Sequence, residues 1–281
     1  MLLMLWGCFA FDPSTRVDEL RVMAVQSVPA EITPGAVVDI NILMADPIGE
    51  GSDVLVWPCT DLGEGCLEAE LFADNPSLWI QSFSYEEAVT TLSFSVPMEL
   101  GGVVSQLPAE FIPFTGTVMW VLACVPGECD VMSQYEQGNL NLSDFSNPSK
   151  MIEGIEFGRF ALAKRSLRIS NRPEPEQIKN PVVEFDENQE LVLGIGETKE
   201  LNFSYEIRSR FAEAVYLSGY SSAGYIQEGP PRGFGEEEFA MEGTLSLQWV
   251  AQENPEEGSM YVVLEDDKGG VTFWSAPAAV Q

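Results

Sequence analysis

The sequence predicts an all-β protein of two tandem antiparallel β-sandwiches, and three observations support this prediction. Apolar and polar residues alternate with a period of two in segments along the whole chain, as they do in strands with one buried face. Turn-forming residues separate these segments, and apolar residues at helical spacing occur only in a short stretch near 211–215. With 281 residues, of which 45% are apolar, the chain can fill two cores.

The clearest strand of the first half covers residues 36–45. The even-numbered residues of 38–44 are apolar, whereas Asp39 and Asn41 lie on the other face. The segment 91–96 alternates in the same way. We therefore expect strands with one buried face and one face in contact with water.

The rest of the first half predicts a central strand pair and a long insertion. If the sandwich topology holds, Val54–Trp57 and Val118–Cys124 are antiparallel neighbours. Residues 125–153 then form an insertion before a final strand at about 155–169. Connections of this length are unusual in compact domains, and they are either functional or decorative.

The second half begins after a polar, proline-rich segment at 171–177, which predicts an extended linker. Alternation over 201–207 predicts a strand, and the turn at 266–270 predicts a hairpin of 260–265 with 271–274. The predicted domain organisation is a signal segment and tether at 1–17, a first sandwich at 18–170, a linker at 171–181 and a second sandwich at 182–281.

Two motifs carry a resemblance to known domains. Residues 28–35, Val-Pro-Ala-Glu-Ile-Thr-Pro-Gly, resemble the opening of bacterial immunoglobulin-like domains. Residues 261–271, Tyr-Val-Val-Leu-Glu-Asp-Asp-Lys-Gly-Gly-Val, resemble the last hairpin of polycystic-kidney-disease-type immunoglobulin-like repeats. The resemblance implies two immunoglobulin-like sandwiches, and it supplies no catalytic residues.

The N-terminus carries a second resemblance. Residues 5–8, Leu-Trp-Gly-Cys, resemble the lipobox that ends a bacterial lipoprotein signal peptide, which implies a lipid on Cys8. Together with the two domains, the chain is similar to uncharacterised bacterial surface lipoproteins, held at the outer membrane or cell surface. No Lys or Arg precedes Trp6, so a start upstream of Met1, or an ordinary apolar N-terminus, remains an alternative.

The remaining cysteines predict local disulfides. Cys59 and Cys66, and Cys124 and Cys129, form two close pairs without the two-residue gap usual in thiolate zinc sites. Because antiparallel neighbours place Cys59 and Cys124 at opposite ends of the sandwich, we expect the bridges Cys59–Cys66 and Cys124–Cys129. Such bridges indicate an exported protein. The alternative is unpaired cysteines that act as small apolar core residues.

Charge and histidine content exclude several functions. The chain has 44 acidic and 14 basic residues, a formal charge of −30, and no Lys or Arg between Arg21 and Lys150. Its field repels phosphate backbones, so no nucleic-acid partner is expected. Because there is no histidine, Ser-His-Asp and Cys-His nucleophile systems and histidine zinc sites are excluded.

Acidic runs and loop aromatic residues are the candidate ligand sites. No cofactor and no metal site is predicted, although calcium at an acidic run is an alternative to a solvated acidic face. The acidic runs are Asp186–Glu190, Glu236–Glu238 and Glu265–Asp267. Loop aromatic residues can line a sugar-binding groove, with core packing as the alternative. These aromatic residues are Trp79, Phe83 and Tyr85 in the first half, and Tyr220, Tyr225 and Phe234 in the second.

These observations predict a non-catalytic, lipid-anchored cell-envelope protein that acts as a spacer or as a binding or adhesion module. Its partners are a membrane, through the lipid on Cys8, and a protein or polysaccharide that the sequence does not identify. The alternative is a structural subunit of an extracellular or surface assembly. An enzyme that uses carboxylates alone, such as a glycoside hydrolase, is the third hypothesis.

Overall fold

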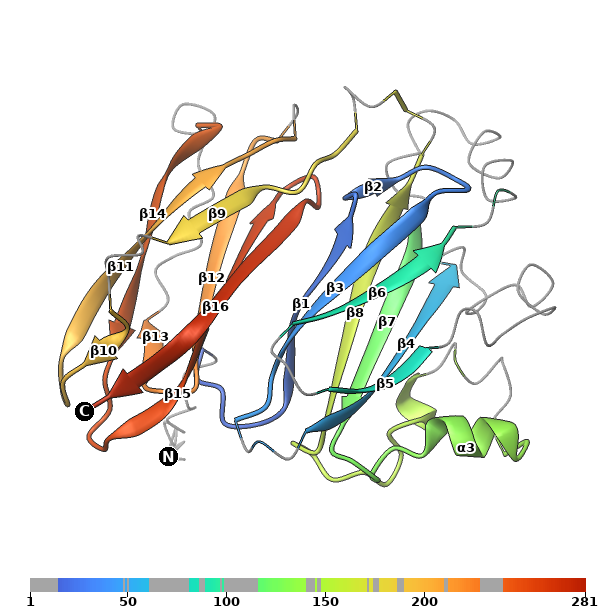
Figure 1. Ribbon diagram of the computed structural model, residues 1–281, viewed down its shortest axis with the longest axis horizontal. Helices are drawn as coiled ribbons and strands as arrows, with labels where there is room; N and C mark the ends of the chain where they lie inside the picture. The colour runs from blue at the N-terminus through green and yellow to red at the C-terminus, as the bar shows by residue number, and fades with distance from the viewer. Residues whose placement is uncertain are drawn as a thin grey trace, which may run out of the picture.

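The structure is a computed structural model in which two β-sandwiches lie side by side (Figure 1). It describes residues 15–47, 49, 51–60, 81–85, 89–96, 98, 116–139, 145, 148–170, 172–173, 177–185, 190–209, 212–227 and 240–281. The predicted fold class, all-β with tandem immunoglobulin-like sandwiches, is confirmed.

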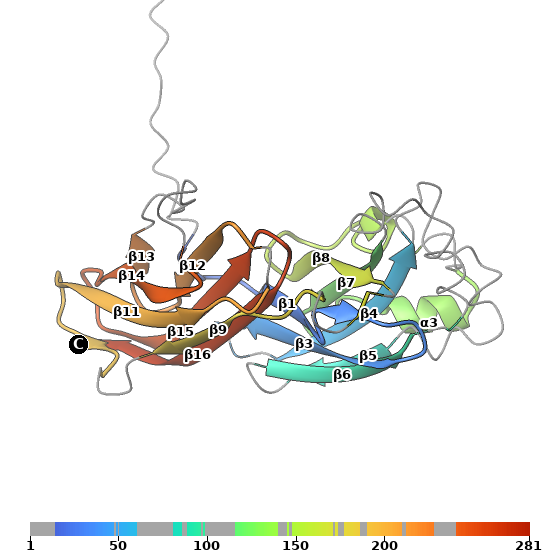
Figure 2. The same ribbon diagram turned by 90° about the horizontal axis from the view of Figure 1, so that it is seen from above.

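The first sandwich has a three-stranded and a five-stranded sheet, which form separate layers in Figure 2. The three-stranded sheet has the order β1 (Arg21–Val28), β3 (Val37–Ala45), β6 (Val89–Ser95). The five-stranded sheet has the order β2 (Glu31–Ile32), β8 (Phe160–Ile169), β7 (Gly116–Cys124), β4 (Ser52–Thr60), β5 (Gln81–Tyr85).

The second sandwich has two four-stranded sheets. One has the order β9 (Val182–Phe185), β11 (Thr198–Glu206), β14 (Glu242–Val250), β13 (Tyr225–Gln227). The other has the order β10 (Val192–Leu193), β16 (Val271–Val280), β15 (Glu256–Asp266), β12 (Val215–Ser221).

The two sandwiches share a framework of seven strands and differ in the eighth, because β5 pairs with β4 in the first and β13 pairs with β14 in the second. In each, a short strand near the beginning, β2 or β10, pairs in parallel with the last strand, β8 or β16. All other named strand pairs of the described residues are antiparallel. This is the strand arrangement of immunoglobulin-like sandwiches.

Several sequence predictions are confirmed strand by strand. The segments 36–45, 91–96 and 201–207 lie in β3, β6 and β11. Strands β4 and β7 are antiparallel neighbours, with Trp57 opposite Trp120. Strands β15 and β16 form the predicted hairpin, with Glu265 opposite Val271.

Each sandwich buries one apolar core between its sheets. In the first, Ile40 and Ile42 of β3 meet Val54 and Val56 of β4, all at 1% exposure or less. In the second, Leu201 and Phe203 of β11 meet Val262 of β15. Alternate residues of these strands supply the cores, because successive side chains point to opposite faces of a sheet.

The prediction of one wet face is wrong for part of β3. Leu43 and Ala45 lie on the same face as Asp39 and Asn41, yet both are 0% exposed. The second sandwich covers them, as described below. An unbroken apolar run, here residues 42–45, is the pattern of a strand buried on both faces.

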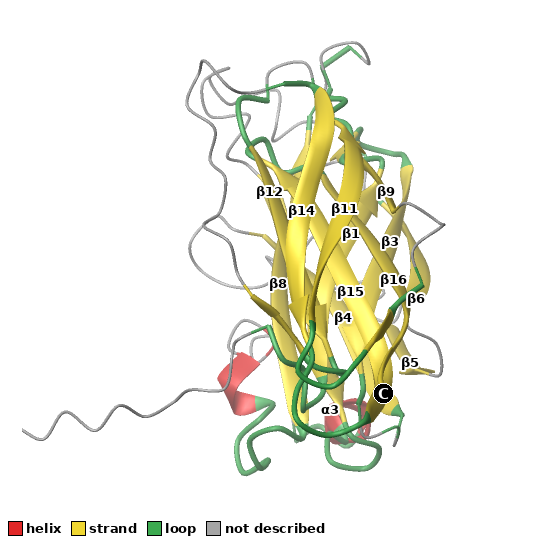
Figure 3. Cartoon of the chain, turned by 90° about the vertical axis from the view of Figure 1, so that its left-hand side faces the viewer, coloured by secondary structure: helices red, strands yellow, loops and turns green. Residues whose placement is uncertain are grey.

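The insertion of the first sandwich contains a short helix, α3 (Val131–Glu136), and a 3-10 turn, η4 (Pro148–Lys150). Figure 3 shows α3 and the C-terminus at a similar height, but they lie on opposite sides of the molecule in Figure 1, α3 on the first sandwich and the C-terminus on the second. The predicted final strand at about 155–169 begins at Phe160, so the connection runs from 125 to 159. None of the helices in the described part of the chain has the length and hydropathy needed to cross a bilayer.

Candidate functional site at the junction of the two sandwiches

The N-terminal residues 15–17 pair with the second sandwich before the chain enters the first. Arg16 forms a parallel bridge with Ser221 of β12. The Val17 N–H donates to the Ser221 carbonyl, and the Ser221 N–H donates to the Thr15 carbonyl, both at 2.9 Å. Since β12 is an edge strand, these residues extend the sheet of a domain that is distant in sequence.

Side chains reinforce this pairing. The Thr15 hydroxyl donates to the Ile226 carbonyl. The Arg16 guanidinium contacts Glu256 through two nitrogens, at 3.1 and 3.4 Å, and its Nε lies 2.6 Å from Asp18. Burial alone lowers the pKa of Arg16, but hydrogen bonds and charges from both carboxylates outweigh it and hold that pKa above its ordinary value.

An apolar cluster joins the outer faces of two sheets. From the first sandwich and its N-terminal segment come Val17, Ala24, Leu43 and Ala45. From the second come Tyr261, Val263 and Val271, and all seven are at most 8% exposed. Strand β15 is consequently buried on both faces, because its even-numbered residues 260–264 fill its own core.

Polar side chains cross the same junction. Gln26 donates to the Val271 carbonyl at 2.7 Å and accepts from Asn41 at 2.8 Å. Asn180 donates to the Ser27 carbonyl at 2.6 Å, and its oxygen accepts from the Val271 N–H at 3.0 Å. These pairs satisfy buried groups that a separated sandwich would expose to water.

Glu31 holds the segment that connects the sandwiches. Its carboxylate accepts from two nitrogens of Arg172, from the Ser170 hydroxyl and from the Ile178 N–H. Burial raises the pKa of the Glu31 carboxyl, and these donors lower it by more, so the pKa lies below its ordinary value. The predicted linker 171–181 is thus fixed at residues 172 and 178 to the first sandwich.

The β15–β16 turn also contacts the first sandwich. Arg165 of β8 donates to the Gly269 carbonyl and pairs with Glu265 at 3.3 Å. Gly269 has a φ of 96°, a left-handed conformation that favours glycine. The turn that closes the second sandwich is therefore also a docking element.

The turn uses the acidic run that suggested calcium. Asp266 accepts from the Ser209 hydroxyl and from the N–H groups of Lys268 and Gly270, at 2.7 to 2.9 Å. Asp267 accepts from the N–H groups of Glu213 and Ala214. These oxygens organise the turn. No group of three or more His, Cys, Asp or Glu with metal-binding geometry occurs among the described residues.

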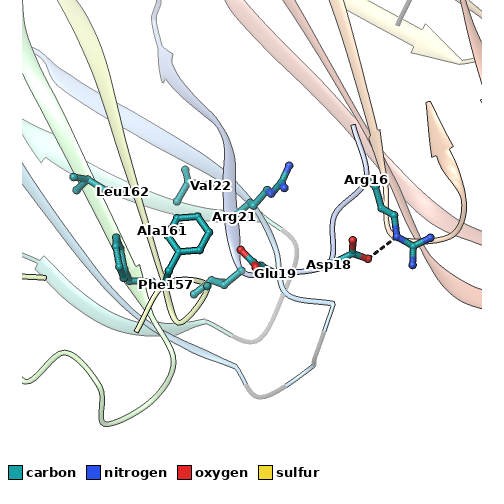
Figure 4. Close-up of a pocket in the computed structure, with 11 residues that line it drawn as sticks. Arg16, Asp18, Glu19, Arg21, Val22, Phe157, Ala161 and Leu162 are labelled. Atoms are coloured by element: carbon teal, nitrogen blue, oxygen red, sulfur yellow. Dashed lines mark hydrogen bonds and ion pairs between the residues drawn. The ribbon is translucent and has the colours of Figure 1, made fainter. Parts of the chain in front are cut away.

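A cleft of about 560 Å³ opens beside the N-terminal segment (Figure 4). Its apolar wall comes from Leu20 and Val22 and from residues 160–162 at the start of β8. Arg16, Asp18, Glu19 and Arg21 add charged groups. Phe157 stands at the cleft with 83% of its surface exposed, more than any other large apolar side chain in the described ranges.

The insertion builds its own small core against the outer face of β4 and β7. Trp57 and Phe145 are 0% exposed and meet edge to face, with ring centroids 5.8 Å apart. The Trp57 indole donates to the Phe145 carbonyl at 3.1 Å. A disulfide joins Cys124 to Cys129, with Cα atoms 5.8 Å apart, at the beginning of this insertion.

The other predicted site residues are only partly described. Cys8 and Cys66 lie outside the described residues, as do Asp186–Gln189, Glu236–Glu238, Trp79 and Phe234. The side chains of Cys59, Phe83 and Tyr85 are outside the description, so the Cys59–Cys66 bridge stays a prediction.

Of the loop aromatic residues, Tyr220 packs against the junction cluster instead of lining a groove. A second hollow of about 670 Å³ is lined by Phe185 and Trp274, whose rings lie 4.9 Å apart. Both rings are partly buried and pack against the core of the second sandwich, so the hollow opens beside that core.

Comparisons with known proteins give no family. No family model matches the chain, and no curated protein matches it. Solved structures that align with it include alpha-2-macroglobulin of Escherichia coli activated by porcine elastase, with a TM-score of 0.27 and 10% identity over 96% of this chain. The native conformation of that protein aligns over 93% of this chain, with a TM-score of 0.27 and 10% identity.

Dimeric latent PorU from Porphyromonas gingivalis aligns over 94% of this chain, with a TM-score of 0.25 and 10% identity. The chain spans 22%, 17% and 24% of the length of these three structures. Likenesses at this level carry no functional assignment.

Proposed function

We propose that the chain is a non-catalytic, exported cell-envelope protein, anchored by a lipid on Cys8, whose two sandwiches act together as a rigid spacer or binding module. The observation that carries this proposal is the junction. Seven apolar residues and the contacts of Gln26, Asn180 and Glu31 join the described parts of the two sandwiches.

Rigidity suits a spacer or presenting module, because a ligand or partner held on a rigid body loses less orientational freedom on binding. Among the described residues, the cleft at Phe157 and the hollow at Trp274 are two concave surfaces, and the hollow is the one available to a protein or polysaccharide partner. The second offers an aromatic pair beside Glu184, a combination of ring face and carboxylate that suits a sugar.

Two described carboxylates serve as hydrogen-bond acceptors within the fold. Glu31 and Asp267 are the described carboxyl groups with shifted pKa values, and hydrogen bonds lower both pKa values in spite of burial. Both carboxylates accept hydrogen bonds from groups that hold the fold together.

A structural subunit is the second candidate, and one strand edge favours it. In the second sandwich β13 covers the outer edge of β14, whereas within the described residues β6, the equivalent strand of the first sandwich, pairs only with β3. An open edge can accept a strand from another chain. Sedimentation at rising concentration tests this candidate, and an assembly that Val89→Pro abolishes would favour it over the leading proposal.

Mass spectrometry of the protein from its native host tests the leading proposal. We expect acyl groups on Cys8 as the first residue and two internal disulfides. An unmodified Cys8 behind an intact Met1, with free thiols, would overturn it.

A further inference from the structure

The place where the N-terminal segment leaves the folded body limits how an anchored protein can be oriented. Residues 15–17 form a clasp on the second sandwich, in which the Thr15 hydroxyl donates to the Ile226 carbonyl, and the Thr15 carbonyl and the Val17 N–H bond to Ser221. Six residues lie between Cys8 and Thr15, and a fully extended chain over these seven steps reaches about 24 Å. A lipid on Cys8 therefore holds this point of the molecule close to the bilayer.

Thr15 is bonded to the second sandwich, but Arg16 lines the cleft, and residues 18–22 lead from it to one end of the first sandwich. Arg21 and Ala45 face each other there, where β1 begins and β3 ends. Residues 157–158 lie beside them, because a Cβ on Gly158 would come within 3.0 Å of the Glu19 carboxyl carbon. Val37 begins β3 at the opposite end, about 26 Å away for a strand of 9 residues.

We infer that the end of the first sandwich formed by the cleft and Phe157 is the membrane-facing surface of the anchored protein, with Phe157 in contact with the lipid interface. This inference rests on the proposed lipid anchor. The occupant is a bilayer surface, because the short chain that joins Cys8 to Thr15 ends beside this cleft. Phe157 has the character of interfacial anchors, which place an aromatic ring at the boundary of headgroups and acyl chains.

Charge keeps the rest of the molecule away from the lipid. With a net charge of −30, the surface as a whole is repelled by anionic headgroups. The anchored protein therefore contacts the bilayer with the cleft end and not with the side of the sandwiches. The turn at Gly269 and the segment held by Glu31 then lie toward the far end, away from the bilayer.

Fluorescence quenching by brominated lipids tests this orientation. The oxidised full chain is coupled through the Cys8 thiol to a maleimide phospholipid in phosphatidylcholine vesicles, with or without bromine on the acyl chains. Phe157→Trp adds an indole at the cleft end. Val37→Trp and Met98→Trp add one at positions 60% and 70% exposed, and Met98 contacts Gly35 near the start of β3.

We expect bromine to remove most of the fluorescence that Phe157→Trp adds and to leave the additions of both controls unchanged. Equal quenching in all three variants, quenching only at a control position, or no quenching at all would overturn the inference. Melting curves that match the parent chain show that each exposed substitution leaves the fold intact. Because the anchor is supplied chemically, the result is independent of whether the host acylates Cys8, which mass spectrometry decides separately.

Discussion

The two sandwiches share a framework of seven strands but differ in the connection between their last two strands. In the second, the turn at Asp266–Gly270 closes β15 onto β16. In the first, residues 125–159 lie between β7 and β8 and carry α3, η4 and a disulfide. The strands form the scaffold of each sandwich, whereas the connection can vary and take on a function. The short turn docks the sandwiches together, and the long insertion builds an additional core.

Two buried tryptophans, one in each sandwich, show the same difference between a main core and an insertion core. Trp249 faces the core between the sheets of the second sandwich and donates to the Ala223 carbonyl at 2.7 Å. Trp57 points away from the main core of the first sandwich and packs under the insertion. Each indole is 0% exposed, but only Trp249 holds two sheets together.

The largest effect is expected from Trp249→Ala. Removing this indole leaves a cavity between two sheets, and we expect the free energy of unfolding to fall by about 4 kcal/mol. Urea unfolding measures it. In the matched variant Trp57→Ala, hydrogen exchange should rise mainly in 125–159. Equal exchange throughout both sandwiches in Trp57→Ala would show that the insertion is not a separate core.

The next largest effect is expected at the junction, from Leu43→Ala. It removes contacts with the second sandwich and should cost about 3 kcal/mol. Because the lost contacts join the sandwiches, one calorimetric unfolding transition should separate into two. Ile42→Ala, its neighbour on the core face, should cost a similar amount with a single transition. If both variants keep one transition, the junction does not couple the sandwiches.

A smaller effect is expected from removal of the disulfide by Cys124→Ser with Cys129→Ser. A short ring contributes about 2 kcal/mol, mainly by restricting the unfolded chain. Limited proteolysis should cut first within 125–159, while the second sandwich keeps its stability. Unchanged proteolysis of the insertion would contradict a local role for this bridge.

The smallest effect is expected from Glu31→Gln, about 1.5 kcal/mol at neutral pH, because four hydrogen bonds lose their anionic acceptor. Since folding lowers the pKa of Glu31, its stabilisation is complete above the ordinary value of 4.5 and is lost as the pH falls through the folded pKa. Parent and variant stabilities should therefore converge as the pH falls below 4.5 and through the lowered folded pKa. A constant difference down to pH 2 would show that Glu31 does not titrate in this range.

Sequence patterns predicted the strands well where alternation of apolar and polar residues is enough to identify them. Alternation identified β3, β6 and β11, because one face of each packs on a core. Burial of the opposite face depends on a partner that alternation does not reveal. The unbroken apolar runs at 42–45 and 260–264 were the available signal for the junction.

The candidate site was harder to predict. The clasp joins Thr15 to Ile226, which are 211 residues apart in the sequence. Its hydrogen bonds use mostly backbone groups, so no pattern of residue types predicts it. The sequence around Phe157 does not predict its exposure either, because that exposure depends on where the insertion ends. The Cys124–Cys129 pairing followed from spacing, because five residues bring the two Cα atoms within bridging distance without help from the rest of the fold.

The central claim is that the two sandwiches move as one rigid body, and rotational diffusion measured by NMR relaxation tests it most directly. We predict one correlation time and one common diffusion tensor for backbone amides in β3 and β11. Two shorter and different correlation times would show independent domains on a flexible linker and would contradict the account.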